Sequence, residues 1–144
     1  MRSKSNLLLL CVAMLLFIPP LLDAVNGYMK SEGACSVVMV VDGDTVKLDC
    51  EDGDYKSARI LGYDAPEKNA QCIAEYIKAN RAAWALRWAM WFADKIEIQK
   101  TKLDKYGRDL VILSVDGRDV ASHMIASDLA RSYQGGKRQG WCGH

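Results

Sequence analysis

The sequence predicts a mainly β, α+β domain that follows an apolar N-terminal segment. Three observations support this fold class. Runs of β-branched residues alternate with Gly/Asp turns over residues 36–61, which is typical of a β-meander. A helical spacing of apolar residues continues without Gly or Pro over residues 72–94. Two further strand-like runs and a short helical segment follow, and 144 residues suffice for one such domain.

The first three expected strands form consecutive hairpins. Residues 36–41 (SVVMVV) are rich in β-branched valine, and residues 42–44 (DGD) supply turn chemistry. Residues 45–48 then alternate as a strand does. A second turn at 51–54 precedes a third strand over 56–61. The order predicts a three-stranded meander.

A long helix is expected from Cys72 to Asp94. Its large apolar residues recur at helical spacings: Ile73, Ile77, Trp84, Trp88 and Trp91. We interpret the tryptophans as core residues. The alternative is a dimer or partner surface, because the helix is apolar around more than one face.

The second half of the chain completes the fold. Strands are expected over 95–99 and 110–115 around a turn at 104–108, followed by a short helix over 120–127 and an irregular Gly-rich tail over 134–144. This order is that of a five-stranded Greek-key barrel, the OB-fold, with one long and one short helix.

The N-terminus has the features of a secretory signal peptide. Arg2 and Lys4 precede an apolar run from Leu7 to Ile18, which Pro19-Pro20 interrupts. The run is too short for an ordinary transmembrane helix, which takes about 20 apolar residues.

Cleavage after Ala24 or Gly27 fits best, which gives a signal over residues 1–27 and a domain over residues 28–144. We expect a secreted or periplasmic protein without stable membrane association once the signal is cleaved. The alternative is an uncleaved membrane anchor, since neither site has small residues at both flanking positions.

The charge balance of the expected mature domain is even. Removing Arg2, Lys4 and Asp23 from the 19 basic and 18 acidic residues leaves 17 of each. A global basic field is therefore excluded, and nucleic-acid binding would require a local cluster of cations.

Four cysteines follow the signal: Cys35, Cys50, Cys72 and Cys142. An even number after a signal peptide indicates two disulfides. Of the three pairings, we favour Cys35–Cys50 with Cys72–Cys142, because the first two flank the hairpin. A zinc site is disfavoured, since no CxxC pair or nearby histidine gives the ligand spacing.

Asp42, Asp44 and Asp64 are candidate ligands for a hard divalent cation, which prefers carboxylate and carbonyl oxygens. Each lies in or beside a predicted turn. Because Asp and Gly are common turn formers, a simple tight loop is the alternative for each segment.

Three further charged residues occur near the same strand ends. Arg59 lies within an apolar strand, Glu67 follows Pro66 in the loop after it, and Arg108 lies in the later turn. Arg59 and Glu67 are expected to converge near Asp64. The alternative for both arginines is an ordinary solvent-facing position.

Three segments together resemble the signature segments of the staphylococcal nuclease family, in order and at similar spacing. They are residues 41–48 (VDGDTVKL), 59–67 (RILGYDAPE) and 104–108 (DKYGR). The resemblance covers roughly Cys35 to Tyr133 and implies the same OB barrel.

The resemblance implies a calcium (Ca²⁺) site. Asp44 and Asp64 would be ligands, with the backbone carbonyl of Ala65 as a third and water completing the shell. The family usually has Thr where Ala65 stands, which removes a hydroxyl but not a carbonyl. Asp42 would support the site without binding the metal.

The resemblance also assigns the catalytic residues. Arg59 and Arg108 would clamp the scissile phosphate through paired guanidinium hydrogen bonds. Glu67 would orient or deprotonate the attacking water. Cleavage would leave 3′-phosphate ends.

Lys105 and Tyr106 match family positions that contact a terminal phosphate and a nucleotide. Tyr133 lies near a region where the family places aromatic residues against the base. The alternative for both tyrosines is an ordinary structural position. Arg131, Lys137 and Arg138 could widen a phosphate track near the C-terminus, and the alternative is a solvated charged tail. The sequence thus predicts a calcium-dependent nuclease acting on DNA or RNA. The alternative is a noncatalytic OB-fold nucleic-acid-binding module.

Overall fold

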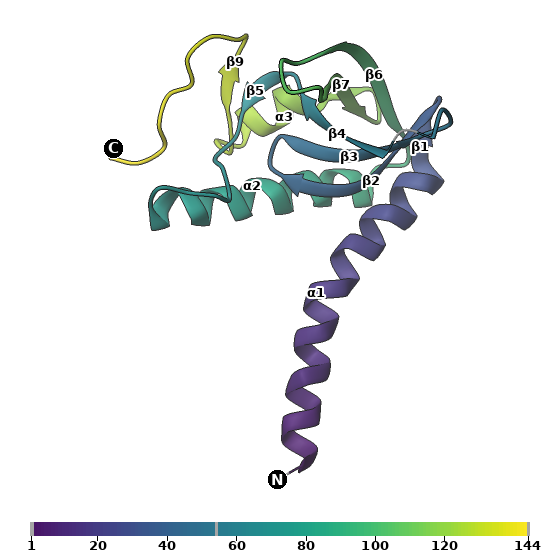
Figure 1. Cartoon of the computed structure of the whole chain (residues 1–144), viewed down its shortest axis with the longest axis vertical. Coiled ribbons are helices and arrows are strands. Elements are labelled where there is room, and N and C mark those ends of the chain that lie inside the picture. The colour runs from purple at the N-terminus through teal and green to yellow at the C-terminus, as the bar shows by residue number, and fades with distance from the viewer. Residues whose placement is uncertain (1, 54, 144) are drawn as a thin grey trace.

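The computed structural model describes residues 2–53 and 55–143, and Figure 1 shows helices packed against a curled sheet. The elements in chain order are α1 (Arg2–Lys30), β1 (Ser31–Glu32), β2 (Cys35–Asp42), β3 (Thr45–Cys50), β4 (Tyr55–Ile60), β5 (Gly62–Asp64), α2 (Ile73–Phe92), β6 (Ile96–Leu103), β7 (Asp109–Val115), β8 (Arg118–Asp119), α3 (Val120–Ala126) and β9 (Arg131–Tyr133).

The central sheet contains all five expected strands. Its order is β1-β6-β7-β4-β3-β2, with β8 paired to β7. The β2–β3, β3–β4 and β6–β7 pairs are antiparallel, and β4 pairs with β7 in parallel. The α+β class is confirmed, and the sheet is consistent with an OB-fold.

Two details of the expected fold need correction. The sheet is a curled half-barrel, not a closed five-stranded barrel, because β1 and β2 lie at opposite ends of its order and no pairing joins them among the described residues. The structure also has three helices where one long and one short helix were expected, since the N-terminal segment is itself helical.

Both expected disulfides are present. Cys35 and Cys50 are direct partners in the β2–β3 register, so the bridge closes the open end of the hairpin. Cys72 and Cys142 join the start of α2 to the tail across a sequence separation of 70. The second bridge therefore holds the irregular tail against the domain.

Helix α2 packs through a face of small side chains. Ala82 and Ala83 are buried beside Leu86 and Met90. A Cβ placed on Gly43, in the β2–β3 turn, would come within 2.6 Å of the Ala82 Cβ. The turn therefore rests directly on the helix, and only glycine allows this approach.

The expectation that the tryptophans lie in the core is wrong for two of them. Trp84 and Trp88 are 39% and 49% exposed. Their positions fall on the side of the helix opposite Ala82, Leu86 and Met90, because each residue turns the helix by about 100°. The dimer through this helix stays a prediction that no contact supports.

Helix α1 is longer than the apolar run suggested. It continues through Pro19 and Pro20 to Lys30 and changes direction about halfway along (Figure 1). Proline removes a helical hydrogen bond and commonly kinks a helix without ending it. The expected boundary after residue 27 therefore falls within a continuous helix.

A short two-stranded sheet was not expected from the sequence. Strand β5 pairs with β9, which places Gly62 opposite Tyr133 and Asp64 opposite Arg131. The pair brings the start of the tail beside the end of β4. This placement defines one wall of the site described next.

Candidate active site

A buried arginine joins two buried aspartates at the centre of the site. Arg59, on β4, is 6% exposed. Its Nη1 lies 2.9 Å from Oδ2 of Asp44, and its Nη2 lies 3.1 Å from Oδ1 of Asp64. Buried charges are retained only when they are paired. The hairpin turn, β4 and the end of β5 thus bring three predicted residues together, and Arg59 does not face solvent.

The position of Asp44 is fixed from several sides. Its Oδ2 accepts a hydrogen bond of 3.1 Å from the backbone N–H of Ala65, and its Oδ1 accepts one of 2.9 Å from the Thr45 hydroxyl. The buried Tyr63 hydroxyl donates a 2.8 Å hydrogen bond to the carbonyl of Gly43. Burial raises the pKa of Tyr63 well above its usual value, so the phenol stays a donor.

Asp42 lies outside this network and supports the neighbouring loop. Its Oδ2 accepts a 3.1 Å hydrogen bond from the N–H of Lys68, and its Oδ1 accepts one from its neighbour Gly43. Burial raises the pKa of Asp42, and these backbone hydrogen bonds partly oppose that shift. The residue ties the hairpin turn to the loop that carries Glu67.

Glu75 anchors the same loop from α2. Its side chain is buried and accepts hydrogen bonds from the N–H groups of Glu67, at 3.5 Å, and Gln71, at 3.0 Å. Sequence reasoning missed this role. A glutamate in the first turn of a helix is ordinarily interpreted as favourable to the helix itself, and nothing in the local pattern shows that it turns inward.

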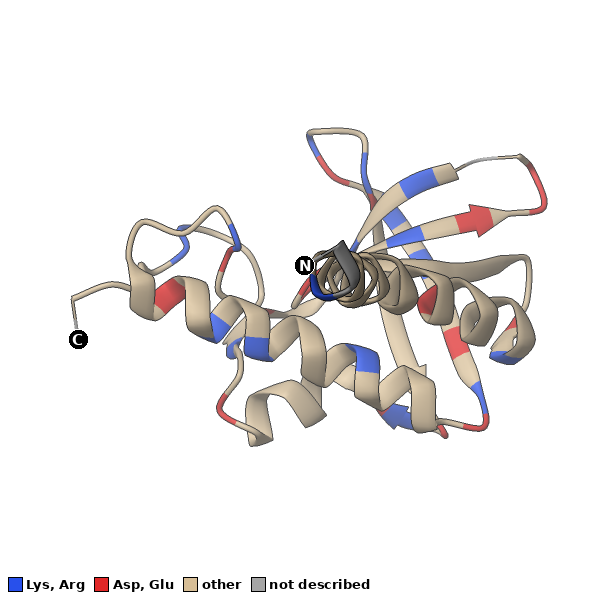
Figure 2. Ribbon diagram, turned by 90° about the horizontal axis from the view of Figure 1, so that it is seen from below, with Lys and Arg blue, Asp and Glu red and all other residues tan. Residues whose placement is uncertain are grey.

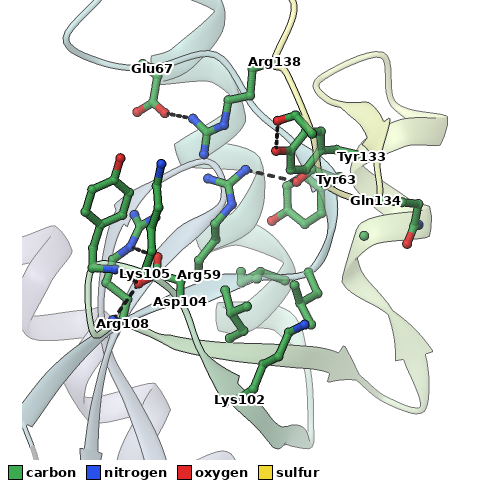
Figure 3. A pocket seen from close by; sticks show the side chains of 17 residues that line it. Arg59, Tyr63, Glu67, Lys102, Asp104, Lys105, Arg108, Tyr133, Gln134 and Arg138 are labelled. Carbon is green, nitrogen blue, oxygen red and sulfur yellow. Dashed lines mark hydrogen bonds and ion pairs between the residues drawn. The ribbon is translucent and has the colours of Figure 1, made fainter.

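Arg138, from the tail, reaches into the acidic group. Its Nε lies 3.0 Å from Oδ1 of Asp64, and its Nη1 donates a hydrogen bond to Oε1 of Glu67 (Figure 3). Partial burial raises the pKa of Glu67, as does the nearby Asp44, while Arg138 lowers it. Arg138 thus binds carboxylates and also lines the cavity described below, and its contribution to a phosphate track stays a prediction.

Arg108 is held by the first residue of its own turn. Oδ1 of Asp104 accepts hydrogen bonds from the N–H groups of Tyr106 and Arg108, at 2.8 and 2.9 Å, and Oδ2 accepts one of 2.7 Å from the Arg108 Nε. The two terminal nitrogens of Arg108 take no part in these bonds. The sequence motif contained Asp104, but its role as the residue that orients Arg108 emerges from the geometry.

These groups surround one cavity of about 670 Å³. Figure 3 shows Arg59, Lys105, Arg108 and Arg138 around it, with Glu67 on its rim. Six predicted site residues line the cavity: Arg59, Glu67, Lys105, Tyr106, Arg108 and Tyr133. The lining contains five lysine or arginine residues against two acidic ones, so the cavity favours an anion.

Two of the three tyrosines of the lining, Tyr106 and Tyr133, each contact a cation. The Nζ of Lys105 lies 4.9 Å from the ring centre of Tyr106, and the guanidinium of Arg59 lies 5.9 Å from that of Tyr133. Aromatic faces beside cations are a common arrangement for holding nucleotides, because the base stacks while the phosphate is neutralised. The predicted ligands Asp44, Asp64 and Ala65 are not part of the lining but lie buried beside it.

The donor set of the aspartate pair fits a hard cation. Asp44 and Asp64 are bridged by one guanidinium, so their carboxylates are close neighbours. Oδ1 of Asp44 accepts only from Thr45, and Oδ2 of Asp64 accepts no hydrogen bond from the residues that the structure describes. Carboxylate oxygens in such a pair are the ligands that calcium prefers.

A second cluster of potential metal ligands, formed by two cysteines and one glutamate, is not suited to a metal. Among the described residues, three ligand atoms of Cys72, Glu75 and Cys142 lie within 4.8 Å of one another. Both sulfurs are joined in a disulfide and have no thiolate to offer a metal. This finding agrees with the expectation of disulfides in place of zinc.

The curled sheet is consistent with an OB-fold and carries a cation-lined cavity beside a carboxylate pair. The family model described as staphylococcal nuclease homologue matches residues 57–140, more than half of the chain. The chain therefore belongs to the staphylococcal nuclease family. The matched range contains Arg59, Asp64, Glu67 and Arg108, whereas Asp44 lies ahead of it on the hairpin.

Proposed function

We propose that this chain is a calcium-dependent nuclease that hydrolyses phosphodiester bonds of DNA or RNA and leaves 3′-phosphate ends. The observation that carries the proposal is Arg59, held between Asp44 and Asp64 at the wall of a cation-lined cavity. A phosphodiester is an anion that several cations must neutralise for water to attack it. A metal-binding carboxylate pair beside such a cavity supplies this arrangement.

Calcium would be held by Asp44, Asp64 and the backbone carbonyl of Ala65, with water and substrate oxygens as further ligands. When bound, it would supply positive charge and Lewis acidity at the scissile phosphate. The methyl group of Ala65 packs close to Gly43. Alanine in place of the usual threonine removes a hydroxyl group but keeps the backbone carbonyl that would bind the metal.

The two arginines would bind the phosphate from different sides. Asp104 holds Arg108 through Nε, which leaves its terminal nitrogens free to donate to two phosphate oxygens. Arg59 is fixed by two carboxylates and needs little reorganisation. Preorganised donors of this kind stabilise the charge that develops in the transition state.

Glu67 would orient the attacking water and accept its proton. The water oxygen would bond to phosphorus as the bond from phosphorus to the 5′ oxygen breaks, and the 5′ oxygen would take a proton from solvent and leave as a hydroxyl. Its backbone is fixed by Glu75, and its side chain is bound by Arg138. Arg138 would have to release Glu67 before the carboxylate acts on water.

Lys105, Tyr106 and Tyr133 would hold the flanking nucleotides. Stacking on an aromatic side chain is worth about 1–3 kcal/mol per base and does not depend on sequence. This suits a degradative enzyme acting on single strands. The two disulfides favour an extracytoplasmic location, secreted or periplasmic.

The test separates a nuclease from a noncatalytic binding module. Single-stranded DNA and RNA are incubated with the oxidised protein and calcium, and the ends of the products are analysed. We expect shortened fragments whose 3′ ends release phosphate on phosphatase treatment. Binding in a gel-shift assay with intact substrate throughout would favour the binding module instead.

A further inference from the structure

We propose that the outward face of α2 rests on the bilayer in which α1 remains anchored. We call this surface the aromatic face; it consists of Ile73, Tyr76, Ile77, Trp84, Trp88 and Phe92. The proposed partner is the interfacial region of a phospholipid membrane. Three features of the molecule support it: the free half of α1, the contacts of its other half, and the position of α2.

The first half of α1 is suited to the interior of a bilayer. The helix is long and apolar enough to cross a membrane, and nearly all of its large side chains are exposed, with Leu15 at 76% and Phe17 at 72%. The stretch from Ser5 to Leu22 has a length of about 27 Å at 1.5 Å per residue. That is close to the hydrocarbon thickness of roughly 30 Å.

The second half of α1 is built into the domain through Asp23. This carboxylate is 1% exposed and accepts hydrogen bonds of 3.0 Å from the Val40 N–H, 3.0 Å from the Arg87 Nε and 2.9 Å from the Trp91 indole. Cleavage after residue 24 or 27 would remove Asp23. The guanidinium and indole on α2 would then lose their common partner, at the cost that unsatisfied buried groups carry.

Gly27 makes a close contact between α1 and the sheet. A Cβ at this position would lie 1.5 Å from the carbonyl oxygen of Val37, so the helix packs directly on β2. Lys30, at the end of α1, contacts α2 by donating a hydrogen bond of 2.6 Å to the carbonyl of Trp91. A segment destined for removal has no need of such specific packing, and α1 is therefore assigned as a retained anchor.

The charges set the direction of insertion. Arg2 and Lys4 precede the apolar stretch, and positive residues favour the cytoplasmic side. The domain would then lie on the opposite side, where its two disulfides persist. Both features place the domain outside the cytoplasm with α1 in the membrane.

Helix α2 is the part of the domain that such a bilayer would meet first. In Figure 1 it lies along the base of the domain, on the side from which α1 extends. Figure 2 looks from that side and shows α2 in front of the sheet, with α1 seen end-on. The elements around the cavity, β9 and the β6–β7 turn, lie on the far side, so substrate can reach the site.

The aromatic face has the composition of an interfacial surface. Ile73 is 80% exposed and Phe92 is 75% exposed, and the Trp88 and Phe92 rings stack at 5.3 Å between centroids. Contiguous exposed apolar patches mark protein or membrane contacts, and tryptophan concentrates at the membrane interface.

The charges on α2 agree with this partner. Lys78 and Arg81 are exposed, whereas the single acidic residue of the helix, Glu75, is buried. Exposed cations beside a tryptophan-rich face are typical of helices that lie on anionic phospholipid surfaces.

The test uses the tryptophans as depth probes. The full chain is reconstituted in vesicles of phosphatidylcholine and phosphatidylglycerol, with and without bromine on the phosphatidylcholine acyl chains. We expect brominated lipid to quench the tryptophan emission. The Trp84→Phe, Trp88→Phe double variant should lose the larger part of that quenching while keeping an apolar face.

Trp141→Phe is the matched control and should keep the quenching, because Trp141 lies in the tail. Equal tryptophan emission in brominated and ordinary vesicles would overturn the proposal. A second copy of the chain covering the aromatic face would also overturn it. Intact mass gives an independent result. A chain that still contains Asp23 supports the anchor, and one beginning at residue 25 or 28 overturns it.

Discussion

Arg138 binds one oxygen of each of two carboxylates that a nuclease site would use. It contacts Asp64, a proposed metal ligand, and Glu67, the proposed base. The guanidinium and a calcium ion are both cations and would compete for the same carboxylates. We therefore expect this tail residue to oppose metal binding, although no signature segment contains it.

Replacing Arg138 should ease metal binding. In Arg138→Gln, the calcium concentration for half-maximal cleavage is expected to fall roughly two- to fivefold, since a partly exposed ion pair contributes up to about 1 kcal/mol. The measurement is the cleavage rate against calcium concentration. Lys137→Gln is the control and should leave the curve in place. A lower maximal rate with an unchanged calcium requirement would instead make Arg138 a phosphate ligand.

The two clamp arginines should not tolerate lysine. Arg59→Lys and Arg108→Lys each keep a positive charge but lose the paired donors, and we expect the rate to fall about 10²–10³-fold, as for loss of a transition-state donor. Arg131→Lys serves as the control. Near-normal turnover in both clamp variants, with circular dichroism unchanged, would mean that the phosphate binds elsewhere.

Elements with a long periodic pattern were predictable from the sequence, and short ones were not. The spacing predicted α2 to within a few residues, and alternation predicted the five main strands. Strands β5 and β9 have three residues each, too few to show a period, and they exist because they pair with each other across the fold. The burial of Glu75 and the reach of Arg138 depend on the same tertiary contacts, so local pattern could not reveal them.

The bridge between α2 and the tail should contribute measurably to stability. It closes a long loop, and removing such a native bridge costs roughly 2–5 kcal/mol. We expect the Cys72→Ser, Cys142→Ser double variant to lower the free energy of unfolding in urea by that amount and to free Arg138. Cys11→Ser is the matched control, because Cys11 is an unpaired, exposed residue of α1. An unchanged unfolding curve in the double variant would contradict this role.

At the scale of the whole molecule, the same chain combines a cation-lined cavity on one side with an exposed apolar surface on the other. The cations of the cavity form a local cluster. Nucleic-acid binding would require such a cluster, because the basic and acidic residues of the expected domain are equal in number. The sequence indicated both the apolar N-terminal run and the tryptophans of α2. It did not indicate that α1 extends from the side of the domain on which α2 lies. That relation depends on Asp23, a single residue that the sequence places in an expected signal peptide.

Calcium-dependent cleavage is the most direct test of the central claim. The oxidised protein and its Glu67→Gln variant are incubated with single-stranded DNA over a range of calcium concentrations and with chelator, and initial rates are measured. The account predicts cleavage that rises with calcium, stops with chelator and falls by about 10²–10⁴-fold in the variant, the range for general base catalysis. Intact DNA at every calcium concentration, or equal rates for the two proteins, would contradict it.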